Sequence, residues 1–92
     1  VIKLGCVKPI DAEPILTSIK KTGRLLVAEE VCSAGCVGEA ICSTIPDKIP
    51  VKSRLINLGA GIICQGTIDE LRKKYGIDED GIFAAAKELC DA

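Results

Sequence analysis

The sequence contains no histidine, no methionine and no tryptophan, and its only aromatic residues are Tyr75 and Phe83. Without histidine, no mixed cysteine and histidine metal site can form. The 12 basic and 13 acidic residues give a net charge of −1, so the chain lacks the basic surface and stacking rings with which proteins bind nucleic acids. Its apolar runs are much shorter than the roughly 18 residues of a membrane span. We therefore expect no nucleic-acid partner and no membrane insertion.

The length allows one small domain, residues 1–92, and 48% of the residues are apolar, which is typical of a globular fold. Such a chain buries only about 60–65% of the surface of its unfolded form, so its stability is marginal without further support. Because it has no initiator methionine and no visible export signal, we expect a processed chain or a piece of a longer protein. The segments between its six cysteines have helix and strand patterns, so we predict reduced thiols and a cytoplasmic location.

The predicted elements follow the order strand, helix, strand, helix, strand, helix, helix. Continuous apolar, β-branched or strand-like segments predict strands over residues 1–7, 25–28 and 54–58. Capping residues and apolar stripes at helical spacing predict four helices, which begin after Asp11, at about Val37, after Thr67 and after Asp78. The order predicts an α/β fold of three layers, with helices on both sides of a mainly parallel sheet. The strand over residues 25–28 is expected to be central.

Candidate polar groups lie where the second strand ends. Glu29 and Glu30 are neighbours on an extended segment and point to opposite faces, so they cannot act on one substrate atom as an acid and base pair. One of them could instead hold a structural hydrogen bond. Gly35 and Gly38 flank a predicted helix start, where free backbone N–H groups could hold an anion. Tight turning and close helix packing are the favoured reasons for these glycines.

The cysteine spacing matches no familiar metal site. Cys32, Cys36 and Cys42 are separated by three and five residues, and small buried side chains explain them better than a site of four thiolates. Cys36 could have a lowered pKa at a helix N-terminus, so surface reactivity stays open. Residues 78–81 resemble a calcium loop only faintly, and helix capping by Asp78 explains them better.

Several motifs taken together resemble the C-terminal domain of the transketolase superfamily. They are Val1-Ile2-Lys3-Leu4, Val7-Lys8-Pro9-Ile10-Asp11, Val27-Ala28-Glu29-Glu30, Gly35-Cys36-Val37-Gly38, and Gln65-Gly66-Thr67 with Asp69-Glu70-Leu71. Within the superfamily, residues 75–82 are most similar to the 1-deoxy-D-xylulose-5-phosphate synthase family. The family-motif structural positions are Lys8, Pro9, Asp11, Glu29, Glu30, Gly35 and Gly38.

This resemblance implies a parent enzyme that uses thiamine diphosphate to condense pyruvate with glyceraldehyde 3-phosphate, in the synthesis of isoprenoid precursors. Thiamine diphosphate and Mg²⁺ would lie in the preceding domains of that parent. The resemblance therefore implies no catalytic, cofactor-binding or metal-binding residue in this chain, which would not be an enzyme alone. Its partners would be the preceding domains, and it would support a homodimer.

The chain departs from the family pattern at two places. The family has an Arg that contacts the substrate phosphate where this chain has Gly5, which offers no charge. The family's loop after the last strand is altered at residues 59–62. Two alternatives therefore stay open: a divergent transketolase or a domain of a 2-oxoacid dehydrogenase β-type subunit with another acceptor, and a free-standing small α/β regulatory or binding module.

The resemblance also implies that a strand and a helix are missing before Val1. In the family, that strand lies between the first two strands predicted here. An empty place would leave backbone N–H and C=O groups of two strands unpaired. We therefore expect residues 1–7 to pair directly with residues 25–28, or another chain to fill the gap.

Overall fold

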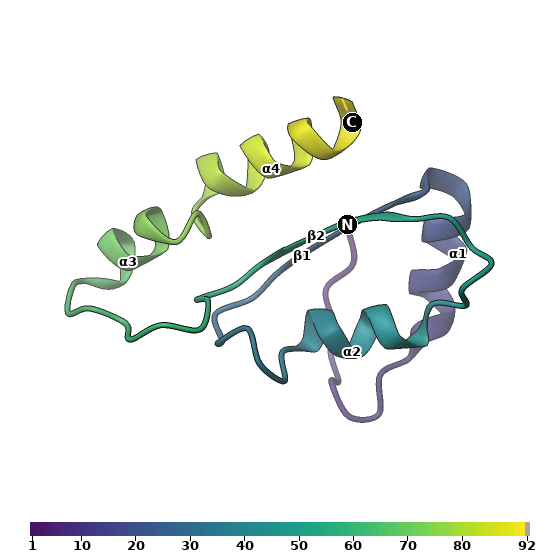
Figure 1. Ribbon diagram of the computed structural model, residues 1–92, viewed down its shortest axis with the longest axis horizontal. Helices are drawn as coiled ribbons and strands as arrows, with labels where there is room; N and C mark the ends of the chain where they lie inside the picture. Colours follow the sequence, from purple (N-terminus) through teal and green to yellow (C-terminus); the bar gives the residue numbers. More distant parts are fainter. Residues whose placement is uncertain (92) are drawn as a thin grey trace.

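The computed structural model describes residues 1–91, in which four helices surround a sheet of two strands. The elements are α1 (Ala12–Thr22), β1 (Arg24–Ala28), α2 (Val37–Thr44), β2 (Lys52–Ile56), α3 (Ile68–Lys74) and α4 (Glu79–Asp91). The two strands are parallel, with Arg24 opposite Lys52 and Ala28 opposite Ile56. α1 and α2 lie on one side of the sheet and α4 on the other (Figure 1). The predicted α/β fold of three layers is confirmed, with a smaller sheet than expected.

The helices begin at the capping residues that the sequence indicates. The side chains of Asp11, Thr67 and Asp78 each accept a hydrogen bond from a backbone N–H two or three residues further along the chain. These bonds satisfy N–H groups that the first turn of a helix leaves without a partner. α1 ends at Gly23, whose φ of +69° is the left-handed conformation that glycine adopts without strain.

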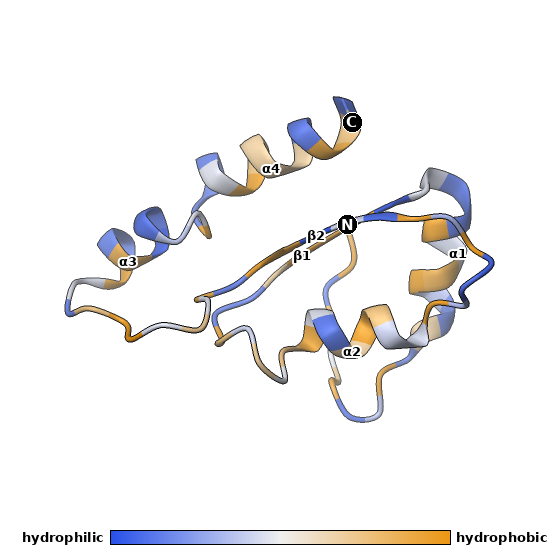
Figure 2. Ribbon diagram, in the orientation of Figure 1, coloured by the Kyte–Doolittle hydropathy of each residue, from blue (hydrophilic) through white to orange (hydrophobic). Residues whose placement is uncertain are grey.

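The core lies between the sheet and the pair α1 and α2. Ile15, Ile19 and Ile41 are buried there, and Leu25 and Val27 of β1 pack against them. Because side chains alternate along a strand, the even-numbered residues of β1 face α4 instead. In Figure 2 the two strands, which carry both hydrophobic and hydrophilic residues, lie between α4 and the pair α1 and α2.

The predicted first strand is wrong. Residues 1–7 form neither helix nor strand, and within residues 1–91 β1 pairs with β2 alone. β1 is therefore an edge strand, and residues 1–7 do not pair with it directly as one alternative proposed. A β-branched sequence favours extended geometry, but a strand also needs hydrogen-bond partners from a neighbour. The last predicted strand begins earlier than expected, at Lys52, where its register with Arg24 starts.

The chain is less tightly packed than a free-standing domain of its mass. Its accessible surface is 6710 Å², whereas compact monomers of 9.7 kDa expose about 5,100 Å². Its radius of gyration is 13.8 Å, against about 12 Å for a compact domain of this length. Exposed apolar side chains include Ile62 and Phe83. None of the helices in residues 1–91 is long and apolar enough to cross a lipid bilayer.

Candidate functional site

Glu29 connects the end of β1 to the start of α2. Its two carboxylate oxygens accept hydrogen bonds from the backbone N–H groups of Val37, at 2.8 Å, and Gly38, at 2.7 Å. A carboxylate is well placed here because the N-terminus of a helix carries partial positive charge and unpaired N–H groups. The predicted structural hydrogen bond of one glutamate is therefore made by Glu29.

Gly35 allows a tight turn and Gly38 allows close helix packing, which are the two roles that the sequence predicts for these glycines. Gly35 has a φ of +72°, which glycine adopts without strain. Gly38 is buried, and a Cβ at this position would lie 2.8 Å from the side chain of Leu55. Its neighbour Glu39 accepts a hydrogen bond from the Gly35 N–H at 3.1 Å. α2 therefore approaches β2 closely at a position where only glycine fits without a shift.

The start of α2 does not fit an anionic ligand. The N–H groups that could bind one already donate to the carboxylates of Glu29 and Glu39. A diphosphate would have to displace these negative groups and then remain close to them. The residues of this turn therefore do not fit the diphosphate of a thiamine cofactor, and we derive no catalytic step from them.

Glu30 faces away from Glu29, as predicted. Its carboxylate forms an ion pair with Arg72 of α3 at 2.7 Å, and both side chains are about half exposed. The neighbouring glutamates thus serve two separate contacts, one with α2 and one with α3. They do not converge on a common point as an acid and base pair would.

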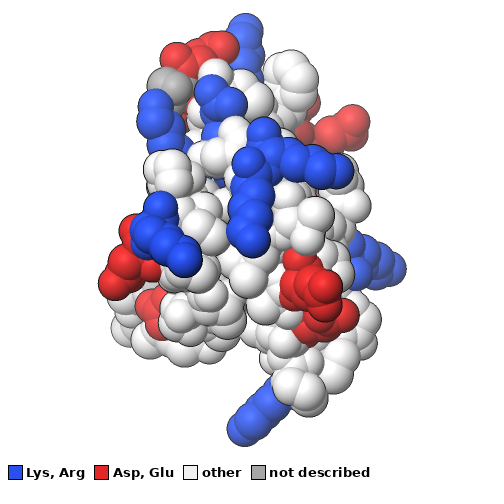
Figure 3. Space-filling view, turned by 90° about the vertical axis from the view of Figure 1, so that its right-hand side faces the viewer, with Lys and Arg blue, Asp and Glu red and all other residues white. Residues whose placement is uncertain are grey.

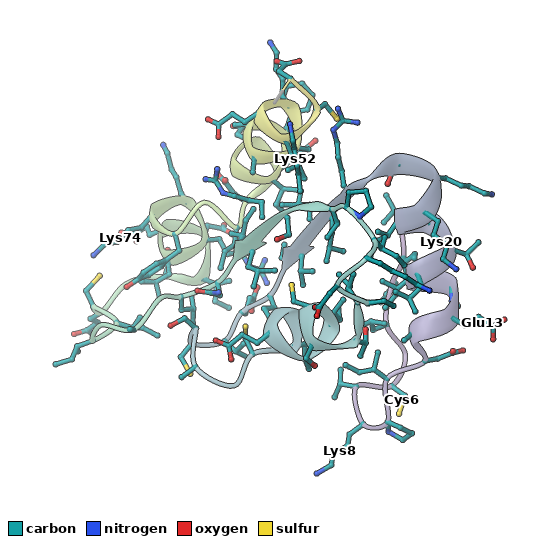
Figure 4. The ribbon with its side chains drawn as sticks, turned by 45° about the vertical axis from the view of Figure 1, so that its right-hand side comes forward. Cys6, Lys8, Glu13, Lys20, Lys52 and Lys74 are labelled. Atoms are coloured by element: carbon teal, nitrogen blue, oxygen red, sulfur yellow. The ribbon has the colours of Figure 1, made fainter. Side chains whose placement is uncertain are left out.

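The other family-motif positions lie before α1. Lys8 and Pro9 are exposed in this loop, and Figure 4 shows the Lys8 side chain pointing away from the molecule. Asp11 caps α1. Gly5 is also exposed, and a Cβ there would meet no atom within 4 Å. The structure thus brings Glu29, Gly35 and Gly38 together in one turn, while the positions before α1 form a separate group.

A groove of about 670 Å³ runs between residues 1–7 and β1. Its floor includes the apolar side chains of Ile15, Ile19 and Ile41. On its other side it is bounded by Val1, Ile2, Lys3, Leu4 and Val7. Sequence reasoning expected a gap beside β1 but not this cavity, which depends on the path of residues 1–7 away from the strand.

All six cysteines are free, and Cys6, Cys32, Cys64 and Cys90 are exposed. Cys36 is only 3% exposed, so the surface reactivity considered for it is wrong: its side chain packs inside although it precedes a helix. Among residues 1–91, no three side chains of the metal-binding types cluster together. The sequence missed one contact, in which the Lys74 ammonium donates to the Cys64 sulfur at 3.0 Å. This hydrogen bond is the main reason that the pKa of Lys74 is raised.

Charged side chains of both signs share the side of the molecule that carries α1. Figure 3 shows Lys and Arg side chains beside Asp and Glu side chains on this face, with uncharged surface between them. The charge therefore does not form a single basic or acidic field on this side.

The family model and the similar proteins agree on one family for this chain. The model of the family "Transketolase, C-terminal domain" matches residues 1–82. A 1-deoxy-D-xylulose-5-phosphate synthase of Alteromonas mediterranea is 32% identical over 97% of this chain, and 1-deoxy-D-xylulose-5-phosphate synthase 1 of Geobacter sulfurreducens is 36% identical over the whole chain. An apulose-4-phosphate transketolase subunit of Phocaeicola vulgatus is 31% identical over 97% of the chain.

These relatives are much longer than the chain. The matched part is 14% and 15% of the two synthases and 28% of the transketolase subunit. No solved structure matches the chain.

Proposed function

Because the chain belongs to the transketolase C-terminal domain family, we propose that it is the assembly domain of a larger transferase and performs no chemistry alone. The observation that carries this proposal is its incomplete packing. About 1,600 Å² more surface is exposed than a compact monomer of this mass shows. Neighbouring domains would cover part of this surface.

We propose thiamine diphosphate with Mg²⁺ as the cofactor of the parent protein, held by its other domains. When bound, thiamine diphosphate supplies the carbanion chemistry of such transferases. The turn of Glu29 in this chain offers no place for the diphosphate, because the carboxylate already occupies the helix N-terminus. The role left for this domain is to pack against its neighbours and to support a homodimer. We also propose a cytoplasmic location, for which the free thiols are the support.

The proposed reaction is the condensation of pyruvate with glyceraldehyde 3-phosphate, in isoprenoid precursor synthesis. Two of the relatives named above are synthases of its product, 1-deoxy-D-xylulose 5-phosphate. A second candidate is a transketolase-type transfer to another acceptor, as in a divergent transketolase or a 2-oxoacid dehydrogenase β-type subunit. Gly5 favours this second candidate, because it cannot hold a phosphate by charge.

The two candidates are separated by assays of the longer protein that carries this sequence. With thiamine diphosphate and Mg²⁺, we expect it to form 1-deoxy-D-xylulose 5-phosphate from pyruvate and glyceraldehyde 3-phosphate, while the 92-residue chain alone forms none. Product from a transketolase donor and a sugar acceptor, without product from pyruvate, would favour the second candidate. Neither product would contradict both. A native gene product of about 9.7 kDa would instead support the free-standing module.

The role of Gly5 is tested by Gly5→Arg in the same longer protein. The position has open space for a side chain, and an Arg donates charge-assisted hydrogen bonds worth about 1.5–3 kcal/mol each. We expect kcat/KM for the phosphorylated acceptor to rise about tenfold, since 1.4 kcal/mol corresponds to a factor of ten. Gly61→Arg is the matched control, because it adds the same charge at another open position. An equal rise in both variants would contradict a specific role for position 5.

A further inference from the structure

Cys64 and Lys74 bring a nucleophilic side chain and a cation together at the surface. Cys64 lies in the segment between β2 and α3, and Lys74 is the last residue of α3. The Lys74 Nζ donates a hydrogen bond to the Cys64 Sγ at 3.0 Å. Both residues are exposed, and Figure 4 shows the Lys74 side chain pointing outward from α3. A small reagent can therefore reach the sulfur from solvent.

Two other exposed cysteines have a different kind of partner. The Cys6 thiol donates to the Lys8 carbonyl oxygen at 3.4 Å. The Cys32 thiol donates to the Ala34 carbonyl oxygen at the same distance of 3.4 Å. A sulfur can donate only while it carries its proton, so these two contacts favour the thiol. An ammonium has donors and no acceptor, so its contact with Cys64 favours the thiolate, which is the nucleophilic form of cysteine.

Several contacts hold the Lys74 ammonium beside this sulfur. The Nζ lies 5.7 Å from the centre of the Tyr75 ring, within the range of a cation–π contact. At the end of α3, a cation is also favoured by the partial negative charge of the helix C-terminus. The hydrogen bond with Cys64 is the main reason that the pKa of Lys74 is raised. The amine is therefore protonated at neutral pH, where it can donate to the sulfur.

We propose that Cys64 is a site of oxidation by peroxides, at which Lys74 stabilises the thiolate. The thiolate attacks one oxygen of hydrogen peroxide, so that an S–O bond forms while the O–O bond breaks. The sulfur loses two electrons, which reduce the peroxide, and the departing hydroxide takes a proton from the Lys74 ammonium and leaves as water. The products are a sulfenic acid at Cys64 and a neutral amine at Lys74, which regains its proton from solvent. This chemistry needs no thiamine cofactor and does not rest on the proposed function.

The test measures the oxidation of each cysteine in the longer protein that carries this sequence. The reduced protein is treated with hydrogen peroxide at about pH 7, a cyclic 1,3-dione traps the sulfenic acid, and peptide mass spectrometry gives the rate at each position. An ordinary thiol is only a few per cent thiolate at this pH, so we expect Cys64 to react about tenfold faster than Cys6 and Cys32. Reaction of Cys64 at the same rate as these two cysteines, or more slowly, would overturn the proposal.

Variants of Lys74 separate its charge from its packing. Lys74→Gln removes the ammonium, so oxidation of Cys64 should slow about tenfold at about pH 7. At about pH 9.5, above the ordinary thiol pKa of about 8.5, this difference should shrink to less than about twofold, because the thiolate then forms without a cationic partner. Lys74→Arg keeps the charge and should keep most of the rate. Lys73→Gln is the matched control, since it removes a neighbouring exposed charge of α3, and it should leave the rate unchanged. An unchanged rate in Lys74→Gln, or an equal loss at both pH values, would show that the ammonium does not activate the sulfur and would overturn the proposal.

Discussion

The two faces of the small sheet are covered by helices in different ways. Toward α1 and α2, β1 presents Leu25 and Val27 to a buried apolar cluster. Toward α4, the contacts include polar ones: Arg24 donates to the carbonyl oxygens of Leu89, at 2.9 Å, and Cys90, at 3.2 Å. The same five residues of β1 therefore build an apolar layer with their odd positions and a partly polar layer with their even positions.

This difference indicates where the stability of the chain resides. Burial of whole apolar side chains contributes about 1.5–3 kcal/mol each, whereas an exposed ion pair such as Arg54 with Glu88, at 2.9 Å, contributes about 0–1 kcal/mol. On the α4 side, Ile56 and Ala85 are the buried apolar residues outside the main cluster. The α1 and α2 side therefore contributes more to the stability of the chain than the α4 layer does.

The largest expected loss of stability comes from a substitution in the buried apolar cluster between the sheet and the helices α1 and α2. Ile19 is 2% exposed at the centre of the cluster, so Ile19→Ala should lower the free energy of unfolding by about 2–5 kcal/mol, because it removes buried methyl groups and leaves a cavity. Denaturant unfolding of the chain measures this loss. Phe83→Ala on α4 is the control, since Phe83 is 70% exposed and its loss should change stability by less than about 0.5 kcal/mol. Equal losses would contradict the contrast between the two faces.

A smaller loss of stability is expected when the carboxylate of Glu29, which joins β1 to the start of α2, is removed. Glu29→Ala removes two hydrogen bonds from a carboxylate to the start of α2, so we expect a loss of about 2–3 kcal/mol. The matched variant Glu30→Ala breaks the exposed ion pair with Arg72 and should cost less than about 1 kcal/mol. Both losses are measured by denaturant unfolding. If Glu30→Ala costs as much as Glu29→Ala, the distinction between these neighbours is wrong.

The sequence predicted the helices better than the strands for a physical reason. Helix hydrogen bonds and caps join residues a few positions apart, so Asp11 and Thr67 mark helix starts without knowledge of the rest of the chain. A strand depends on a distant partner, which residues 1–7 lack in this structure. The wrong first strand is therefore a failure of pairing rather than of local preference.

The candidate site was also predicted only in part from the sequence. The sequence indicated that one of the two glutamates holds a structural hydrogen bond and that the glycines serve packing, but only the fold shows that Glu29 is the glutamate that faces α2. Gly81 was missed as a packing residue: a Cβ there would clash with the backbone of Gly76. The contact of Arg24 with α4 spans 65 residues, a separation at which no local pattern indicates a partner.

On the side of the sheet that α4 covers, we expect a substitution of Arg24 to weaken only the end of α4. Arg24→Gln removes the guanidinium that bonds the last carbonyl groups of α4, which a helix end otherwise leaves without partners. We expect amides in the last turn of α4 to exchange about fivefold faster, which corresponds to about 1 kcal/mol. Amides of α1 should not change. Faster exchange in both helices would show that α4 and the core open as one unit and would contradict the division into two layers.

The smallest expected loss of stability tests whether the ion pair between Arg54 and Glu88 stabilises the α4 layer. Arg54→Gln removes the ion pair with Glu88, whose side chains are 52% and 69% exposed. Such exposed pairs are weakened by water and by salt, so we expect a loss of about 0.2–1 kcal/mol at low salt that shrinks as ionic strength rises to about 1 M. Denaturant unfolding at both ionic strengths measures it, with Arg54→Lys as the variant that keeps the charge and should keep most of the stability. A loss that persists unchanged at high salt would show that Arg54 acts through packing of its apolar stem against the sheet rather than through charge.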